Sequence, residues 1–335
     1  MDVLHRIIAD LQAVLMGLGS RLALIHIASA VVLAFAVWWA RGRDRSFVAF
    51  LLPRSVYLHR SNLLDIKLFA VNRGLAIFGV TGAFVFTTYV AHQTTRMIAD
   101  LTGRLPPAPG DAAILGEMVA VTLVVVLASD FCKYWAHRLH HEWPVLWPFH
   151  AVHHSAEVLT PLTVMRAHPV ETFMRNVLIS LLVGLLQGIM VYALVGQAGL
   201  LAIGGANAFY VIFNALGANL RHSHVWLSFG PVIEHVLISP AQHQVHHSLD
   251  KKHHNKNYGS MFAIWDWMFG TLYVPRNGPE DLRFGVADAK GRPMAQPYET
   301  LGSALAKPFA ESWRIGRRRI EKRRARALPK TPERT

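Results

Sequence analysis

DFCKYWAHRLHHEWPVLWPFHAVHHS, residues Asp130–Ser155, follows an apolar run and carries two histidine groups, HRLHH at 137–141 and HAVHHS at 150–155. The second group returns later in the chain as HQVHHS, His243–Ser248. The flanks of the two copies differ, because AEVLTPL follows the first and LDKKHHN follows the second. The flanks therefore give no support for a duplicated segment, and we interpret the two histidine groups as serving the same chemical requirement at two places in the chain.

The chain around this stretch is rich in apolar residues. Of its 335 residues, 52% are hydrophobic and 16% are charged, whereas about a quarter of a typical soluble domain is charged. Several apolar runs approach the roughly 20 residues that cross a bilayer as a helix. They are Leu22–Ala40, Leu68–Val90, Ala112–Ala128, Asn176–Val195 and Leu200–Leu220. We predict an all-α integral membrane protein with about five transmembrane helices, because a soluble core rarely needs five such stretches.

The charges predict which way these helices run. The first apolar run ends in RGRDR rather than in a small-residue cleavage site, which favours a retained anchor. Residues 41–67 hold six Lys or Arg against two Asp, and basic loops stay on the cytoplasmic side. Five alternating crossings then place residues 137–254 at the cytoplasmic face. The location would be a bacterial inner membrane, or the endoplasmic reticulum in a eukaryote.

The C-terminal segment is strongly basic. From Lys307 to Thr335 it holds eleven Lys or Arg against three Glu. Beside membrane helices we expect it to meet anionic lipid headgroups, at about 1 kcal/mol per basic residue, and we expect no nucleic acid. A docking surface for an acidic redox partner and a solvated disordered tail are the alternatives. The N-terminal segment 1–22 has apolar residues at helical spacing and is expected to lie flat on the membrane.

The histidine spacing predicts a site for two metal ions. Of nineteen histidines, fifteen lie between His137 and His254. Histidines four residues apart share a helix face, while the adjacent His153 and His154 point about 100° apart. One HxxHH turn therefore offers ligands in two directions. Two such turns and one HxxxH provide eight imidazoles, more than a single ion uses, and imidazole suits iron, copper, nickel and zinc.

Missing motifs narrow the chemistry further. The chain has no HExxH, no ExxH, no GxSxG and no GxGxxG. These absences argue against a zincin, a carboxylate-rich di-iron site, an elbow nucleophile and a dinucleotide-binding turn. The single cysteine, Cys132, excludes an intramolecular disulfide and a cysteine-based zinc site. The site must therefore be built from histidines, and its electrons must come from elsewhere.

At this point the sequence resembles a known superfamily, the fatty acid hydroxylases and sterol desaturases. DFCKYWAHRLHHEWPVLWPFHAVHHS resembles its first half, and RHSHVWLSFGP with QHQVHHSLDKKHHNKNYGSMFAIWDWMFGTLY its second, over roughly Leu68–Val274. The resemblance implies a membrane-embedded, non-haem di-iron enzyme that uses O2 and two electrons on lipids. It implies the metal ligands His137, His141, His150, His153, His154, His222, His243, His246 and His247. His168 and His224 are less certain ligands, since relatives differ at these positions.

Outer partners of the histidines are expected among the few nearby acids. Metal-bound histidines usually donate their other N–H to a carboxylate or a carbonyl. The candidates are Asp130, Glu157, Glu171 and Asp266. His140 is expected to be a neighbour of the site, His253 and His254 to be surface residues, and His235 to be structural.

The pattern predicts three segments and one main function. Residues 1–67 hold the amphipathic segment, the first membrane helix and the basic loop; residues 68–275 form the catalytic domain; residues 276–335 form the basic tail. The expected function is hydroxylation of a membrane lipid by two iron ions, with electrons from a separate ferredoxin- or cytochrome b5-like donor. Lipid desaturation and alkylglycerol-ether cleavage are alternatives on the same site. A metal transporter is the alternative of another class, but it would need ligands at mid-membrane rather than at the cytoplasmic ends.

Overall fold

The computed structural model describes residues 3–80, 83–105, 115–193, 208–275, 278–288 and 292–327. Within them the chain forms helices and no β-strand, only isolated bridges such as Leu237 with Phe262. This confirms the prediction of an all-α protein. The α-helices are α1 (Val3–Met16), α2 (Leu24–Ala40), α3 (Phe47–Leu51), α4 (Arg54–Tyr57), α5 (Ser61–Ile77), α6 (Ala83–Thr102), α7 (Leu115–Glu142), α8 (Trp147–His154), α9 (Pro169–Ala193), α11 (Pro240–His246), α12 (Ile264–Met268) and α13 (Leu301–Ala327). The 3-10 helices are η1 (Pro161–Met165), η2 (Ala218–His222), η3 (Ile233–His235) and η4 (Lys251–His253).

Helix α7 joins an apolar run to the first histidine group. It is continuous from Leu115 to Glu142, so His137 and His141 lie one turn apart near the end of a helix that begins apolar. A turn closed by the Leu146 N–H, which donates to the Trp143 carbonyl at 2.8 Å, leads into α8. Most of α8 is buried, its histidines included. The order along the chain therefore carries the first two histidine groups straight into the interior.

Two apolar clusters hold the histidine-bearing segments in place. One joins α5 and α8 to the start of α13 through Leu68, Val152 and Tyr298. The other packs Val126 of α7 against Phe213 and Met261. Each of these six side chains is at least nine-tenths buried, which is the burial typical of a protein core. The clusters flank the histidines and fix the helices that carry them.

One predicted membrane span is wrong. The run Leu68–Val90 is not a single helix, because α5 ends at Ile77 and α6 begins at Ala83. Gly79 has a positive φ of 78°, and the Val80 N–H donates to the Leu75 carbonyl at 2.9 Å while the Gly79 N–H donates to the Ala76 carbonyl. These contacts form a Schellman motif, in which a left-handed glycine ends the helix. A hydropathy count overlooks this stop because the residues around Gly79 are apolar.

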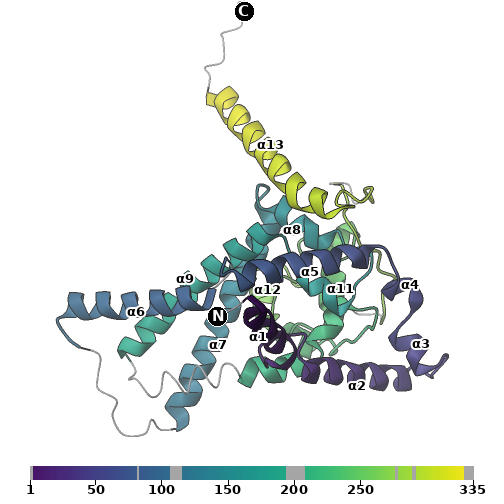
Figure 1. Ribbon diagram of the computed structural model, residues 1–335, viewed down its shortest axis with the longest axis horizontal. Coiled ribbons are helices and arrows are strands. Elements are labelled where there is room, and N and C mark those ends of the chain that lie inside the picture. The colour runs from purple at the N-terminus through teal and green to yellow at the C-terminus, as the bar shows by residue number, and fades with distance from the viewer. Residues whose placement is uncertain are drawn as a thin grey trace, which may run out of the picture.

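Helices α6 and α9 pack closely along a row of small residues (Figure 1). Ser180, Gly184 and Gly188 form the buried face of α9 at four-residue spacing. A Cβ atom at Gly184 would lie 2.7 Å from the Val90 Cβ, and one at Gly188 would lie 2.5 Å from the Thr94 Cβ. Small residues at this spacing let two helix backbones approach, which is how helices associate inside a bilayer. The pair therefore leaves no room for larger side chains.

The long helices expose apolar rather than polar faces. Among the described residues, α9 has the length and composition to cross a membrane, and α2 is a shorter apolar helix. On α9 the exposed side chains include Phe173, Leu181, Leu185 and Ile189. Apolar faces this long are rare on water-soluble monomers. Of the run Leu200–Leu220, residues 200–207 lie outside the described residues, and 208–215 are helical.

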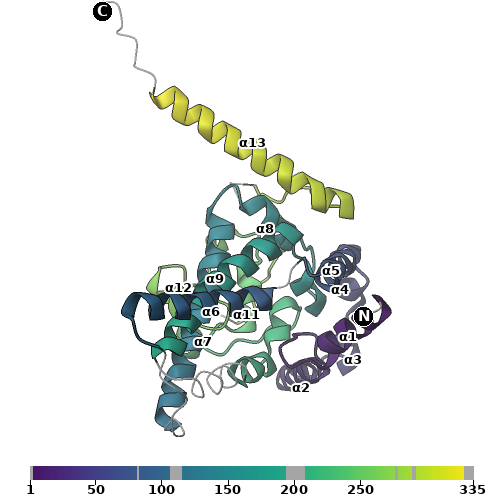
Figure 2. The same ribbon diagram turned by 60° about the vertical axis from the view of Figure 1, so that its left-hand side comes forward.

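The basic C-terminal segment is a helix that leaves the body of the molecule. The first half of α13 packs against α8, and the Ser312 hydroxyl donates at 2.8 Å to the carbonyl of Val145, which lies just before α8. The C-terminal half of α13 projects away from the other helices in both views (Figures 1 and 2). Trp313 and Ile320 are exposed on it beside the arginines. The described part of the tail is therefore an amphipathic basic helix, and the alternative of a disordered tail is wrong up to Ala327.

Candidate metal centre

Nine histidines gather in two groups between the histidine-bearing helices. The first group contains His137, His141, His150, His154 and His246, and the second contains His153, His222, His243 and His247. Within each group, one ring nitrogen of every histidine lies within 4.8 Å of the others. These are the nine histidines for which the sequence predicts metal ligation. The structure brings all nine together, and their ligation of a metal stays a prediction.

The doublet of adjacent histidines in each HxxHH motif divides between the two groups. His153 and His154 are neighbours in the sequence, but they belong to different groups, and the same is true of His246 and His247. The ring planes of the first pair meet at 90° and those of the second at 87°. Successive residues on a helix point about 100° apart, which directs the two rings of each doublet to different sides. Each motif therefore contributes to both groups at once.

Outer contacts orient several rings toward the interior. The Nδ1 atoms of His137 and His246 lie 2.8 Å from the Tyr258 carbonyl oxygen and 2.7 Å from the Lys256 carbonyl oxygen. The Nδ1 of His150 lies 2.9 Å from the Glu171 Oε1. Because a neutral imidazole that donates through Nδ1 keeps a lone pair on Nε2, these contacts fix which nitrogen is free to bind a metal.

The inward nitrogens lack protein partners. Among the nine histidines, buried Nε2 atoms without a hydrogen-bond partner in the described residues belong to His141, His150, His154, His246 and His247. In the second group the Nε2 of His222 lies 3.3 Å from that of His153 and 3.2 Å from that of His243. A buried polar atom without a partner costs folding free energy of about 1–3 kcal/mol. Several in one place fit a site whose partners are metal ions.

The protonation states also fit metal binding. Burial lowers the pKa of His153 to about 4 and that of His246 to about 4. Both rings are therefore neutral near pH 7 and need not lose a proton to bind a cation. The donor set contains only imidazoles, which suits iron, copper, nickel or zinc. On this count the residues fit the two metal ions that the sequence implies.

Two less certain ligands lie outside both groups. The Nε2 of His168 lies 3.1 Å from the Leu305 carbonyl oxygen, and its Nδ1 accepts from the Val170 N–H. The Nε2 of His224 lies 2.7 Å from the Phe50 carbonyl oxygen. Because these contacts hold the rings at other places in the fold, we do not include His168 and His224 in the metal centre.

The four predicted outer carboxylates take different places. Only Glu171 touches a histidine of the centre, through His150. Asp266 accepts from the Tyr258 N–H at 2.8 Å, so it supports the carbonyl that orients His137. Asp130 and Glu157 contact none of the nine histidines. Asp130 holds backbone N–H groups of residues 261–262, and Glu157 pairs with Arg60 at 3.7 Å.

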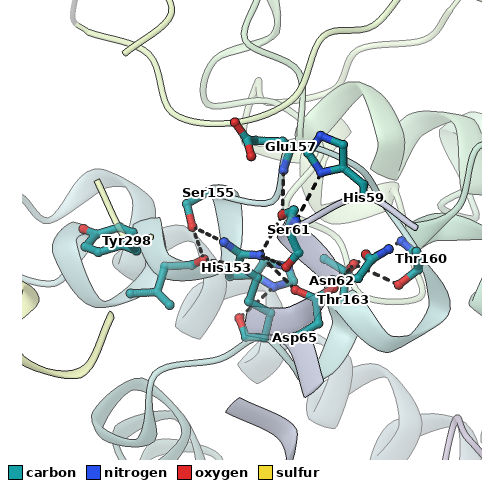
Figure 3. A network of polar contacts seen from close by, with 12 residues as sticks. His59, Ser61, Asn62, Asp65, His153, Ser155, Glu157, Thr160, Thr163 and Tyr298 are labelled. Carbon is teal, nitrogen blue, oxygen red and sulfur yellow. Dashed lines mark hydrogen bonds and ion pairs between the residues drawn. The ribbon is translucent and has the colours of Figure 1, made fainter. Parts of the chain in front are cut away.

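A buried arginine supports the centre in a way that the sequence did not indicate. Arg166 is 1% exposed, and its Nη1 lies 2.9 Å from the Asp65 Oδ1. Its Nη2 donates to the Ser155 Oγ at 2.8 Å, and its own carbonyl oxygen lies 3.3 Å from the His153 Nδ1. Figure 3 shows Ser61, Asp65, Ser155 and His153 directed toward this network. Arg166 thus ties α5 to the C-terminal end of α8, where the histidines lie.

The network also explains the first of the two serines that end the histidine motifs. The Ser155 hydroxyl donates to the Val152 carbonyl at 2.7 Å while it accepts from Arg166. The second serine does something else, because the Ser248 Oγ accepts from the Asp250 N–H at 3.1 Å in a local turn. An arginine and an aspartate about a hundred positions apart carry no sequence signal for such a pair.

Two cavities reach the histidines, and no histidine of the nine lines both. The larger, of about 790 Å³, is lined by His137, His150, His153, His222 and His243. The smaller, of about 370 Å³, is lined by His141, His154, His246 and His247. A separate hollow of about 880 Å³ beside Lys252 and Tyr273 contacts none of them. Only the first two cavities therefore matter for chemistry at the centre.

The contact between Glu171 and His150 gives a direct test of the centre. We expect Glu171→Gln to lower metal affinity by about 10–100-fold, as loss of an outer-shell partner typically does. The amide keeps the size of the side chain and an oxygen that can accept from the His150 N–H, but it removes the negative charge that strengthens this hydrogen bond. Metal retention during dialysis against a graded chelator measures the effect. Glu157→Gln is the matched control, and an equal loss there would contradict the assignment.

The fold and the two histidine groups define a class of protein, that of helical proteins with a histidine-built site suited to metal ions. Residues 122–271 match the family model described as fatty acid hydroxylase. This domain match, together with the relatives named below, fits the fatty acid hydroxylase/sterol desaturase superfamily. The resemblance stated above is thereby confirmed.

Named relatives are hydroxylases, monooxygenases and desaturases. The ornithine lipid hydroxylase OlsE of Rhizobium tropici is 33% identical over 188 residues, which cover 54% of this chain and 51% of that protein. The alkylglycerol monooxygenase of Homo sapiens is 32% identical over 146 residues, 44% of this chain and 29% of that protein. A Delta(7)-sterol 5(6)-desaturase of Gibberella zeae is 29% identical over 150 residues, 45% of this chain and 37% of that protein. The match spans about half the relative's length at most among these, and no solved structure matches.

Proposed function

We propose that this chain is a membrane-bound, O2-dependent monooxygenase that hydroxylates a lipid at an unactivated C–H bond. The observation that carries the proposal is the pair of histidine groups, whose buried, unpartnered nitrogens lie beside two cavities of about 790 and 370 Å³. Five histidines would hold one iron ion and four the other. The bound ions would supply the redox chemistry that no side chain provides, with O2 as co-substrate.

The protein's own part is to position the substrate and to limit the access of water. Val164, Met165, Phe213 and Met261 line the larger cavity with apolar surface next to the histidines. A chain carbon held there is fixed close to the centre, and correct placement contributes much of the rate of an enzyme. The outer contacts of His137, His150 and His246 keep the imidazoles in one orientation between turnovers.

The same proposal places the centre at a membrane surface. The apolar first part of α7, the helix α2 and the α6–α9 pair would be embedded, with the histidines at the cytoplasmic face as the loop charges suggest. The exposed apolar side chains of α9 and the small-residue packing of α6 on α9 support this placement. A substrate would then enter from the bilayer between helices.

Electrons would come from a separate acidic protein, ferredoxin- or cytochrome b5-like. The smaller cavity, beside His141 and His246, is lined also by Ile315 of α13. Helix α13 carries the arginines of the basic tail, which suits an acidic partner or anionic headgroups. Electrons would thus reach the centre from the side of the smaller cavity, whereas the lipid would bind in the larger cavity.

Metal analysis and lipid mass spectrometry test this function together. We expect the purified protein to carry two iron ions per chain, and lipids from cells that express it to gain one oxygen atom in an O2-dependent way. Loss of two hydrogen atoms from the lipid would indicate a desaturase instead. Release of an aldehyde from an alkylglycerol would indicate an ether monooxygenase. The names of two relatives suggest these alternatives. Purified protein that binds metal but shows no O2-dependent turnover would contradict an oxygenase and would favour the alternative of a metal transporter.

A further inference from the structure

The larger cavity is lined by several cationic side chains as well as by apolar ones. Its charged lining comprises Arg21, Arg73, Lys133, Arg175 and Arg221, against the carboxylates Asp10 and Glu171. These cations come from the segment before α2, from α5, α7 and α9, and from η2. Because five separate segments each direct a positive side chain to one cavity, the charge is a property of the cavity and not of one basic stretch.

The two carboxylates do not neutralise this set. Asp10 pairs with Arg73, with 3.3 Å between Oδ2 and Nε. Glu171 lies 2.9 Å from the His150 Nδ1 and only within 3.9 Å of Arg175. In the part of the chain that the structure describes, Arg21, Lys133 and Arg221 have no carboxylate within ion-pair distance. Their charges meet in the cavity without an opposing charge beside them.

Lys133 and Arg221 are held by neutral groups of the protein. The Lys133 Nζ donates to the Tyr210 hydroxyl and lies 3.7 Å from the centre of the Tyr210 ring. Arg221 is 1% exposed, donates to the carbonyls of Ser260 and Ile238, and keeps a buried Nε without an acceptor. Asp130, the next carboxylate, is occupied by backbone N–H groups and acts on both cations only from a longer distance.

Of these cations, the Arg21 guanidinium has the fewest hydrogen-bond and ion-pair partners among the described residues. Its side chain is half-buried and has no hydrogen-bond or ion-pair partner among the residues described. Its backbone is fixed, because the Asn219 Nδ2 donates to the Arg21 carbonyl at 2.7 Å. Burial and the nearby charge of Arg175 lower the pKa of Arg21 to about 10, and it stays charged at neutral pH. Placing unpaired cations out of water is unfavourable unless a counter-charge joins them.

We infer that the lipid substrate is anionic, and that Arg21, Lys133 and Arg221 hold its phosphate or carboxylate inside the larger cavity. The inference rests on the proposed function of that cavity. Val14 of α1 and Met165, Phe213 and Met261 would take the adjoining part of an acyl or alkyl chain. A volume of about 790 Å³ lies within the roughly 300–1,000 Å³ of ligand pockets. It therefore takes a headgroup and the first part of a chain, and the carbon that reacts lies near the charged end.

Binding of matched lipids to the full-length, metal-loaded protein in neutral detergent tests this inference. The probes are a lysophosphatidic acid, the free fatty acid and the monoacylglycerol with the same acyl chain, and inorganic phosphate. We expect the two anionic lipids to bind at least about tenfold more tightly than the monoacylglycerol, since charge-assisted hydrogen bonds are the strong ones. Inorganic phosphate is expected to bind weakly and not to displace the lipids at equal concentration.

Arg21→Gln is the decisive variant because it removes a charge that supports no protein contact. It is expected to weaken binding of the anionic lipids by about tenfold and to leave monoacylglycerol binding unchanged. Lys133→Gln, at a side chain that donates to the neutral Tyr210 hydroxyl, is the second variant should the first lose its fold. Arg318→Gln on the exposed part of α13 is the matched control for attraction to the basic tail, and it is expected to bind all probes like the parent protein.

Equal binding of the neutral lipid, or unchanged anionic binding in both cavity variants, would overturn the inference. So would displacement of the lipids by inorganic phosphate at equal concentration, which would show a site for the free ion. Selective binding without O2-dependent oxidation would leave the ligand class standing and refute the proposed oxygenase. Oxidation of a neutral lipid, without a preference for anionic lipids in binding, would leave the proposed oxygenase standing and refute the ligand class.

Discussion

His153→Ala is expected to abolish lipid oxidation and to remove about half of the bound iron. The second histidine group would keep three members, and no other described side chain lies in place to restore the fourth. We expect activity to fall by more than the roughly hundredfold that the loss of an outer-shell partner costs. His246→Ala makes the comparison, because it leaves the first group with four histidines and is expected to retain more iron than His153→Ala.

Iron per chain, O2-dependent product formation and membrane insertion are measured on each variant. His235→Ala is the control, since the His235 ring contacts the Pro231 carbonyl at 2.6 Å and belongs to neither group. Its iron content and activity should equal those of the parent protein. Full activity in His153→Ala or in His246→Ala, together with purified protein that lacks iron, would refute the two-iron proposal.

Arg166→Met is expected to lower the free energy of unfolding by about 3–5 kcal/mol, because removing one partner leaves the other as an uncompensated buried charge. Asp65 is 0% exposed and would lose its cation. The Ser155 hydroxyl would lose its donor, and the ties between α5 and the end of α8 would weaken. Because the Arg166 carbonyl contacts His153, we also expect weaker iron retention. Thermal unfolding in detergent and iron content measure the two effects.

The double variant Arg166→Met with Asp65→Leu separates charge from geometry. It removes both ions, and it should recover much of the stability, as replacement of buried pairs by apolar residues often does. Arg317→Met is the control at an exposed pair, 3.2 Å from Glu321, where less than about 1 kcal/mol is expected. A loss at Arg166 no larger than the one at Arg317 would show that the buried network does not stabilise the fold.

The histidine geometry was predictable because it depends on local spacing. The HxxHH pattern on a helix is enough to say that His153 and His154 diverge and that the same motif can supply two ions. The nine histidines that the superfamily pattern marks are the nine that the structure collects. For the same reason the continuity of α7 from apolar run to histidines could be foreseen from residues 112–141 alone.

Other features could not be predicted, for identifiable physical reasons. The stop at Gly79 is a backbone conformation, which a count of apolar residues does not register. The acceptors of His137 and His246 are main-chain carbonyls, and any residue type provides those. The pair of Arg166 with Asp65 joins distant segments, and only the packing of η1 on α5 brings them together. The cationic cavity arises in the same way, from five segments that share no motif.

The division of the two histidine groups along the chain has a consequence for biosynthesis. Four of the five histidines of the first group lie between residues 137 and 154, while three of the four in the second group lie at or beyond residue 222. A growing chain therefore completes most of the first group while the second still has only His153. The two ions would join the protein at different stages of its synthesis, and the second would await the arrival of HQVHH. On the proposed function, completion of the second metal site would then be a late step in the synthesis of the chain.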